Sequence, residues 1–518
     1  MRSGILQLAI VALLLPLCAA AEIHSNGLGG GRWSDPASWH GNAVPTKDDA
    51  VVIATGDTIA FDGNDIEQPS CAQVSIDPEG VLTFRADAAS HVLSVAGPIE
   101  SYGAIRMDGT RSPQGSMELR LAGADDAGRT IRLLRNASLL AYGAEGLPDE
   151  RRNVLLSTLE PAAGQPRRLG TVVAGVDTMI DLHSARLTDI AVQASSIDNT
   201  GFKPNERLNI VGNRFAGLSQ LSLNSCDTPL VNGNVFDCGE GVTVPIAITT
   251  ASCKLADIRA NHIVTGYQRG IQVQSDEDSS CTGNTVTAAE ICVYWHGTNA
   301  MVKNNTISGA ATGVQFTSAS GVAEGLGVAG AKTAIEVINS SFQLTDVHVE
   351  NLPEDGVALS LNNAAVTLLN SNLAPEKIKG VGAPPGAEPW VQAMEYLVVR
   401  VKGERPAGTE VEVRTAAASG GPPQGAADLN VRNSPASLST AGFTPLPASL
   451  RPLIVRSWSL KRDGKKGESP FYDLVTSAPA AAEGEAPKVL KTQVIEPKPE
   501  WYRPDPNAPV PTLEVALP

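Results

Sequence analysis

The 518-residue chain has few aromatic residues and no cluster of basic residues. Aromatics make up 4% of the sequence and hydrophobic residues 42%, so a core has to consist mainly of Val, Ile, Leu and Ala. The formal net charge is −15, and no Lys/Arg block interrupts this acidic excess. Because phosphate backbones are bound by clustered cations, the composition argues against nucleic acid or an anionic membrane as partner.

Metal-binding motifs are lacking too. The seven histidines form no H-x-H or H-E-x-x-H, and the cysteines form no C-x-x-C, so we predict no zinc site and no cofactor. The one weak alternative is Ca²⁺ held by the adjacent acids Asp276, Glu277 and Asp278, since carboxylate oxygens are its preferred ligands.

One long apolar run occurs, and it lies at the N-terminus. Arg2 precedes the stretch from Ile5 to Leu17, and Ala19-Ala20-Ala21 provides a small-residue cleavage pattern before Glu22. This order is typical of a signal peptide, so residues 1–21 are predicted to be cleaved from a protein that is secreted, extracellular or in the cell envelope. No later run reaches the roughly 18 apolar residues of a spanning helix, so we predict no transmembrane segment.

The middle of the chain repeats a short pattern. Apolar residues flank an asparagine with fixed spacing in Ile210-x-x-Asn213-x-Phe215, and the asparagine recurs after steps of 21, 27, 23 and 21 residues, at Asn234, Asn261, Asn284 and Asn305. A second series of apolar pairs has similar steps: Ile271/Val273, Ile291/Val293, Val314/Phe316, Ile335/Val337 and Val357/Leu359.

Two period-2 apolar segments in each repeat of about 22 residues indicate stacked β-coils. We therefore predict an all-β protein with a right-handed parallel β-helix over residues 175–380. The asparagines are expected to stack as a ladder at a tight turn, each in the left-handed backbone conformation that Asn tolerates.

Short strands and turns also characterise the region before the repeats. The run W-S-D-P-A-S-W-x-G-x-x-V-P-x-x-D-D-x-V-V-I from Trp33 to Ile53 resembles the start of a G8 domain, and 80–84 fits that family's G-x-L-x-F step. The resemblance implies a G8 β domain over 22–150. We interpret Trp33 and Trp39 as packing residues of its first layer rather than as ligand-stacking residues.

After the repeats, alternating apolar segments return. They occur at 396–401, 411–414, 453–458 and 489–495, and such alternation between turns is typical of sandwich strands. We predict a C-terminal β-sandwich-like domain over 390–518, and a monomer.

Tyr267, Tyr294 and Trp295 are the only Tyr or Trp residues between 143 and 389. Alignment of Ile291 with Ile271 on the next coil leaves Tyr294 pointing outward. It also predicts that His296 lies one coil from Asp276, with Trp295 beside Ser275. Outward rows of this kind also include Gln272, Cys292, Gln315 and Glu336.

Aromatic rings beside acids and a guanidinium suit a sugar, whose C–H faces contact rings and whose hydroxyls bond polar groups. The predicted carbohydrate-binding residues are Tyr267, Arg269, Asp276, Glu277, Tyr294, Trp295 and His296. The catalytic candidates are His296, Asp276 and Arg269, with His296 as a general base oriented by the carboxylate. The alternative is that the Tyr294-Trp295 pair packs beneath a long turn next to a solvated acidic loop.

Disulfides are permitted in an exported protein. Cys226 and Cys253 each lie eight residues before a repeat asparagine, so they should be neighbours on adjacent coils, and we predict that they form a disulfide.

A G8-like region followed by β-coils resembles the extracellular fibrocystin and cell-surface hyaluronidase families. The segment Val293–Asn299, which contains His296-Gly297-Thr298, is similar to their H-G-T coil. Those families continue with Gly-His-Gly and an acid, whereas 311–318 here contains neither histidine nor acid. The leading hypothesis is binding of an extracellular polysaccharide or glycoconjugate. The alternatives are a polysaccharide lyase or glycoside hydrolase, and a structural or adhesion protein without a small ligand.

Overall fold

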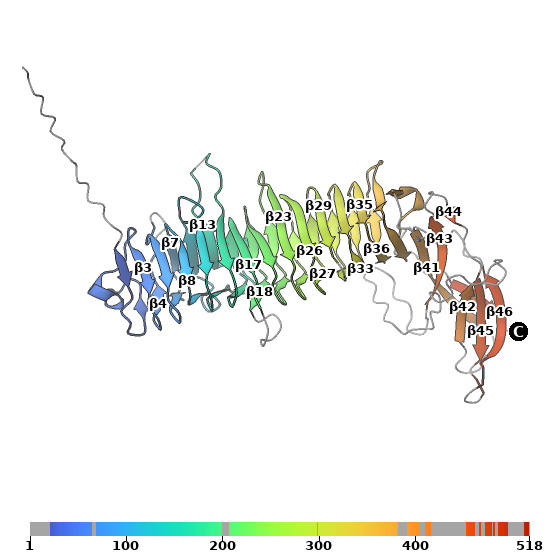
Figure 1. The fold of residues 1–518 in the computed structure, drawn as a ribbon, viewed down its shortest axis with the longest axis horizontal. Helices are drawn as coiled ribbons and strands as arrows, with labels where there is room; N and C mark the ends of the chain where they lie inside the picture. The colour runs from blue at the N-terminus through green and yellow to red at the C-terminus, as the bar shows by residue number, and fades with distance from the viewer. Residues whose placement is uncertain are drawn as a thin grey trace, which may run out of the picture.

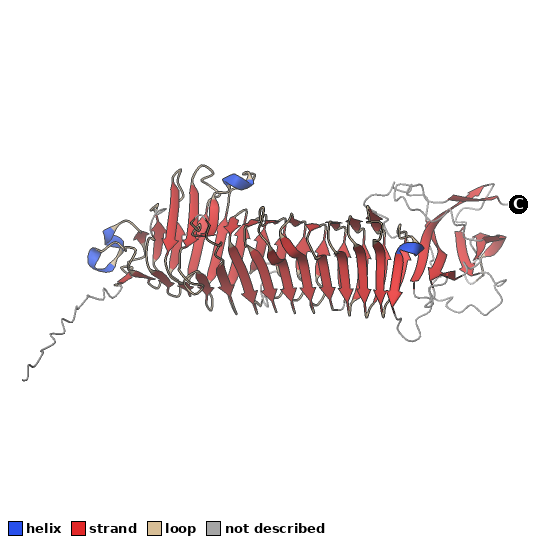
Figure 2. Ribbon diagram, turned by 90° about the horizontal axis from the view of Figure 1, so that it is seen from above, coloured by secondary structure: helices blue, strands red, loops and turns tan. Residues whose placement is uncertain are grey.

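The computed structural model describes residues 21–64, 69–162, 164–198, 207–297 and 299–381, and the C-terminal segments 391–402, 410–415, 452–460, 466–467, 472–478, 480–481, 485–495 and 512–516. In these residues the protein is a long rod of stacked strands, with the C-terminal strands gathered at one end (Figure 1). Figure 2 shows the rod from a second direction, again almost entirely as strand. The all-β prediction is confirmed. Within the described residues, no helix has the length and apolar character needed to cross a membrane.

Each coil of the rod contributes strands to parallel sheets that run along its length. The long sheet has fifteen strands: β1 (Glu22–His24), β3 (Ala50–Ile53), β5 (Gln73–Ile76), β8 (Ile99–Ser101), β11 (Thr130–Leu133), β14 (Gly170–Ala174), β17 (Ile190–Ser195), β20 (Gln220–Asn224), β23 (Val244–Ala251), β26 (Tyr267–Gln274), β29 (Ile291–His296), β32 (Thr312–Thr317), β35 (Thr333–Ile338), β38 (Val357–Asn362) and β40 (Ile378–Val381).

The short sheet has eleven strands: β7 (Ser90–Val95), β10 (Ser116–Leu121), β13 (Val154–Thr158), β16 (Arg186–Thr188), β19 (Arg214–Ala216), β22 (Val235–Asp237), β25 (His262–Ile263), β28 (Thr285–Thr287), β31 (Thr306–Ser308), β34 (Gly327–Ala329) and β37 (His348–Glu350).

A third sheet completes the coils. Its parallel strands are β2 (Gly31–Arg32), β4 (Thr58–Phe61), β6 (Val81–Phe84), β9 (Ala104–Asp108), β12 (Ser138–Tyr142), β15 (Met179–His183), β18 (Leu208–Val211), β21 (Leu230–Asn232), β24 (Asp257–Arg259), β27 (Ser280–Thr282), β30 (Ala300–Lys303), β33 (Ser320–Glu324), β36 (Ser341–Thr345), β39 (Ala365–Leu369) and β41 (Val391–Lys402). Four short 3₁₀ helices lie in the described connections: η1 (Pro36–Ser38), η2 (His40–Asn42), η3 (Asp149–Arg151) and η4 (Pro375–Lys377).

The solenoid is longer than the predicted 175–380. Parallel pairing starts at β1 and passes without a break from β11 to β14 and from β12 to β15, across the expected boundary. The strands of 22–150 therefore stack as the first coils of the same rod. Their connections vary in length, which hides the period in the sequence. Both the G8 identity of these coils and the right hand of the solenoid stay predictions.

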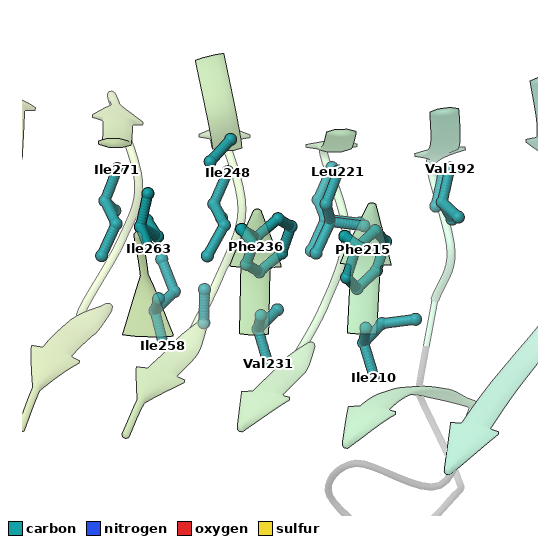
Figure 3. Packing of buried hydrophobic residues seen from close by; sticks show 14 of the residues in the cluster. Val192, Ile210, Phe215, Leu221, Val231, Phe236, Ile248, Ile258, Ile263 and Ile271 are labelled. Atoms are coloured by element: carbon teal, nitrogen blue, oxygen red, sulfur yellow. The ribbon is translucent and has the colours of Figure 1, made fainter. Parts of the chain in front are cut away.

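The core consists of inward side chains that stack from coil to coil. Figure 3 shows three such columns, Val192–Leu221–Ile248–Ile271, Ile210–Val231–Ile258 and Phe215–Phe236–Ile263. All ten side chains are buried, and each contributes about 1.5–3 kcal/mol from burial of apolar surface. The apolar positions read from the repeats are thus the core positions of the strands.

The asparagine ladder is confirmed, with one change. Asn213, Asn234, Asn261, Asn284 and Asn305 are buried. Along the ladder, each of the first four donates its side-chain amide to the Oδ1 of the next, at 2.9–3.1 Å. The left-handed residue is the one before each asparagine, for example Gly233 (φ 65°) or Ala260 (φ 52°), so the asparagine side chain is free to point inward.

The N-terminal end of the core is aromatic. Trp33 and Trp39 are buried, with ring centroids 5.2 Å apart in an edge-on arrangement, and the Trp39 indole donates to the Trp33 carbonyl at 2.8 Å. Phe61 contacts Trp33 on the next coil. The interpretation of the two tryptophans as packing residues agrees with this burial.

At the other end, the solenoid passes directly into the C-terminal strands. β41 pairs parallel with β39 and antiparallel with β43 (Pro452–Leu460), which pairs in turn with β44 (Lys466–Gly467). β41 also pairs with β47 (Thr512–Ala516), while β42 (Glu410–Thr415), β45 (Tyr472–Ala478) and β46 (Lys488–Ile495) form a separate three-stranded sheet. The four predicted C-terminal strand segments are strands; the sandwich arrangement itself stays a prediction.

Candidate functional site

On the face predicted from the Tyr and Trp residues, β29 is shifted by two residues relative to β26, compared with the register expected from the sequence. β26 and β29 pair with Ile271 opposite Val293 and Gln274 opposite His296. The expectation that His296 lies over Asp276 is therefore wrong. Both Ile291 and Val293 fit an apolar alternation, so the sequence pattern did not decide which of them pairs with Ile271.

Tyr267 and Trp295 are core residues. Both are fully buried, and the Tyr267 hydroxyl donates to the Ser219 carbonyl at 2.9 Å. Trp295 lies between Val273 and Phe316 on the adjacent strands. Neither ring can contact a sugar on the outside of the rod, so the stacking role expected for both is corrected.

A smaller part of the predicted face does lie outside. The outward row on the long sheet is Gln272, Tyr294, Gln315 and Glu336, in register on successive strands; Tyr294 takes the place expected for Cys292, which is buried. The Arg269 guanidinium lies 5.7 Å from the centre of the Tyr294 ring and donates to Gln272 at 2.8 Å. Burial raises the pKa of Glu336, against the opposing hydrogen bond from Gln315.

The three acids that follow β26 do not converge. Asp276 is buried and accepts the Cys253 amide at 2.9 Å, and burial raises its pKa. Glu277 pairs with Lys254 at 3.6 Å, and Asp278 accepts from Asn299 at 3.0 Å. Among the described residues, no group of three His, Cys, Asp or Glu side chains is arranged to hold a metal ion.

His296 is also separated from the acids. Its ring lies 3.4 Å from the Ser275 hydroxyl, and its register partners are Gln274 and Thr317. The general base and orienting carboxylate expected from the sequence are thus not assembled, because Asp276 points into the core.

Cys226 and Cys253 are neighbours on adjacent coils, as predicted, but both are free thiols. Both are buried. A hydrogen bond to Cys226, together with burial, raises the pKa of the Cys253 thiol. The spacing of the repeats predicted the contact, and the disulfide is not formed in this structure.

A groove that the sequence analysis missed lies on the short sheet. Its volume is about 900 Å³, and outward side chains of β10, β13, β16, β19 and β22 form its floor. The connection from β13 to β14 and the turn after β22 line its sides; Figure 1 shows long connections rising from the rod near β13.

Two rows of side chains run along the groove floor. One row consists of Glu118, Leu155, Arg186 and Arg214, and the other of Arg120, Ser157, Thr188, Ala216 and Asp237, each in register from strand to strand. Period-2 alternation directs these residues away from the core. The floor therefore offers guanidinium, carboxylate and hydroxyl groups at the spacing of the coils.

Ion pairs hold most of the charged groups in the groove. Arg120 pairs with Glu118 at 2.9 Å, and Arg167 pairs with the buried Asp189 at 3.2 Å. Arg214 bridges Asp149 at 2.8 Å and Asp237 at 2.7 Å. These pairs hold the side chains in fixed positions, so the floor is largely preorganised for a ligand.

No sequence motif marks this groove. The floor residues come from five strands spread over about 120 positions, and each strand, of three to six residues, contributes one or two of them. The available signal was the set of arginines at outward strand positions, but it depends on recognising that β10 and β13 belong to the solenoid.

Comparisons with known proteins add little to this picture. No family model matches the chain, and no curated protein is similar enough to count as a relative. Among solved structures, the chain is similar to the crystal structure of the periplasmic alginate epimerase AlgG, with a TM-score of 0.32 and 13% identity over 62% of this chain and 75% of that one.

Proposed function

We propose that this protein is exported and binds an extracellular polysaccharide in the groove of the short sheet. The observation that carries the proposal is the groove itself, an open depression of about 900 Å³ with a floor of arginines, acids and hydroxyls. Planar charged groups and hydroxyls bond sugar hydroxyls, and a floor built on strands keeps them in position.

The shape of the scaffold supports a polymeric ligand. The floor extends along the rod axis across five coils, and equivalent side chains recur at the spacing between strands, about 4.8 Å. A chain of sugar units lying along the rod would meet outward side chains on each of the five coils, whereas a single small molecule would use only part of the groove.

A bulky side chain introduced into the groove floor tests whether the polysaccharide-binding site lies in the groove. Ala216 lies in the groove between Thr188 and Asp237, so Ala216→Trp should fill the space and abolish binding of any polysaccharide detected on a glycan array. Ser222→Trp, an outward position on the next strand in the long sheet, is the matched control and should bind normally.

The row around Arg269 and Tyr294 is the other possible location. Loss of binding in Tyr294→Ala, with normal binding in Ala216→Trp, would transfer the site to the long sheet and contradict the proposal. If the wild-type protein binds no glycan on the array, the polysaccharide function itself is contradicted, and a structural or adhesion role without a small ligand is favoured.

A further inference from the structure

One guanidinium in the groove has no carboxylate partner. Arg120, Arg167 and Arg214 are each paired with an acid, but the only side-chain bond of Arg186 in the described residues is from Nε to the Thr188 hydroxyl, at 3.3 Å. Among the described residues, Glu160 is the acid of the groove without an ion pair, and it is exposed on the connection after β13.

The register partners of Arg186 on the adjacent strands are not acids. It lies directly opposite Arg214 on one side and Leu155 on the other. The two carboxylates that Arg214 contacts, Asp149 and Asp237, compensate its charge. The four arginines and four acids that line the groove balance, and Arg186 is the arginine whose N–H donors no carboxylate of the described residues occupies.

A carboxylate on a ligand would complement this arrangement. Arg binds a carboxylate through two parallel N–H donors, and such charge-assisted pairs are about twice as strong as neutral hydrogen bonds. The Thr188 hydroxyl accepts from Arg186 Nε and keeps its own hydrogen for a neutral group of the same ligand, whereas the Ser157 hydroxyl on the adjacent strand already donates to Glu118.

We infer that Arg186 is the anion-recognition residue of the groove, and that the ligand is an acidic polysaccharide with a carboxylate on its sugar units. The inference rests on the proposed function, because it assigns a substrate class to the same groove. The other arginines of the groove already form ion pairs with acids of the protein, so Arg186 is the residue that binds the carboxylate of the ligand.

The test compares acid and neutral forms of the same polymers. Oligomers of galacturonate, mannuronate and glucuronate, and their methyl esters, differ in charge and share a backbone. By calorimetry, wild-type protein should bind at least one acid form at least about tenfold more tightly than its ester, the contribution of one charge-assisted pair. Inorganic sulfate serves as a second probe, and binding of sulfate but of no uronate would overturn the carboxylate assignment.

Substitutions assign the preference to one side chain. Arg186→Gln should remove the preference for acid over ester, whereas Arg186→Lys should keep part of it because the charge remains without the two-pronged geometry. Arg259→Gln is the control: it removes the same charge from the third sheet, where Arg259 pairs with Asp257, and should leave the preference unchanged.

The outcomes separate the two proposals. Binding of neutral esters as tightly as acids, blocked by Ala216→Trp, would leave the polysaccharide function in place and overturn the role of Arg186. An acid preference that survives in Arg186→Gln would also overturn it. Binding of no polymer in either form would contradict both.

Discussion

At the scale of single residues, burial decides which polar side chains can serve a site. Asp276, Tyr267 and Trp295 were expected on the surface and are buried, while Arg269, Tyr294 and His296 lie outside. In a strand, successive side chains alternate between the two faces, so the spacing of residues tells which of them share a face. It does not tell where a strand ends and the chain turns inward, and Asp276 lies two residues beyond the end of β26.

Asp276 gives a prediction about pH. Burial raises its pKa above the ordinary value of 3.8, so the native state holds the proton more tightly than the unfolded chain does. Stability should therefore fall as pH rises from 3.8 through the raised native pKa, because ionisation then places a charge in the core. Asp276→Asn keeps an oxygen for the Cys253 amide and cannot ionise.

The variant should unfold at a higher temperature than the wild type at about pH 7, and the gap should narrow as the pH falls through the raised native pKa of Asp276 toward the ordinary value of 3.8. Asp278→Asn, an exposed acid in the same turn, is the control and should show no such pH-dependent gap. A variant that is less stable than the wild type at neutral pH would contradict the account.

At the scale of elements, the ladder of asparagines joins neighbouring coils more specifically than apolar packing does. The Asn261 Oδ1 accepts both the backbone amide and the side-chain amide of Asn234, each at 3.0 Å. Its own amide donates to the Val231 carbonyl at 2.9 Å. A two-residue shift in the register of one strand would still place apolar residues on apolar residues, but it would break these hydrogen bonds of the asparagine ladder.

Asn261→Ala should therefore destabilise the rod strongly. Two buried donors of Asn234 lose their acceptor, and each unsatisfied group costs about 1–3 kcal/mol, so we expect a loss of at least about 2 kcal/mol in denaturant unfolding. Asn232→Ala, at a half-exposed position of β21, is the matched control and should change stability by less than about 0.5 kcal/mol. Equal effects of the two substitutions would contradict the ladder's role.

At the scale of the whole molecule, the ends of the rod have to be covered. Each end of a solenoid presents open strand edges and an apolar core, both of which favour association with another chain. The tryptophans of 33–39 lie at the first end, and β41 pairs with β39 at the other. Val391, Ala393 and Leu460 belong to the core at that end.

Deletion of 391–518 should therefore convert the protein into an associating species. The exposed edge of β39 and the uncovered core should produce dimers and larger assemblies whose share grows with concentration, as measured by light scattering after size-exclusion chromatography. The full chain at the same concentrations is the control. A shortened chain that stays monomeric would show that the C-terminal strands are not needed as a cap.

The sequence by itself determined the class of fold, the β-coil repeat, the core positions and the asparagine ladder, because the spacing of apolar residues and of Asn213 to Asn305 directly reflects the geometry of a coil. Only the tertiary structure decided the register of β29, the length of the solenoid and the location of the groove. Register depends on which of several equivalent apolar residues pair. The groove brings together outward residues of five strands, from β10 to β22, which no local pattern connects.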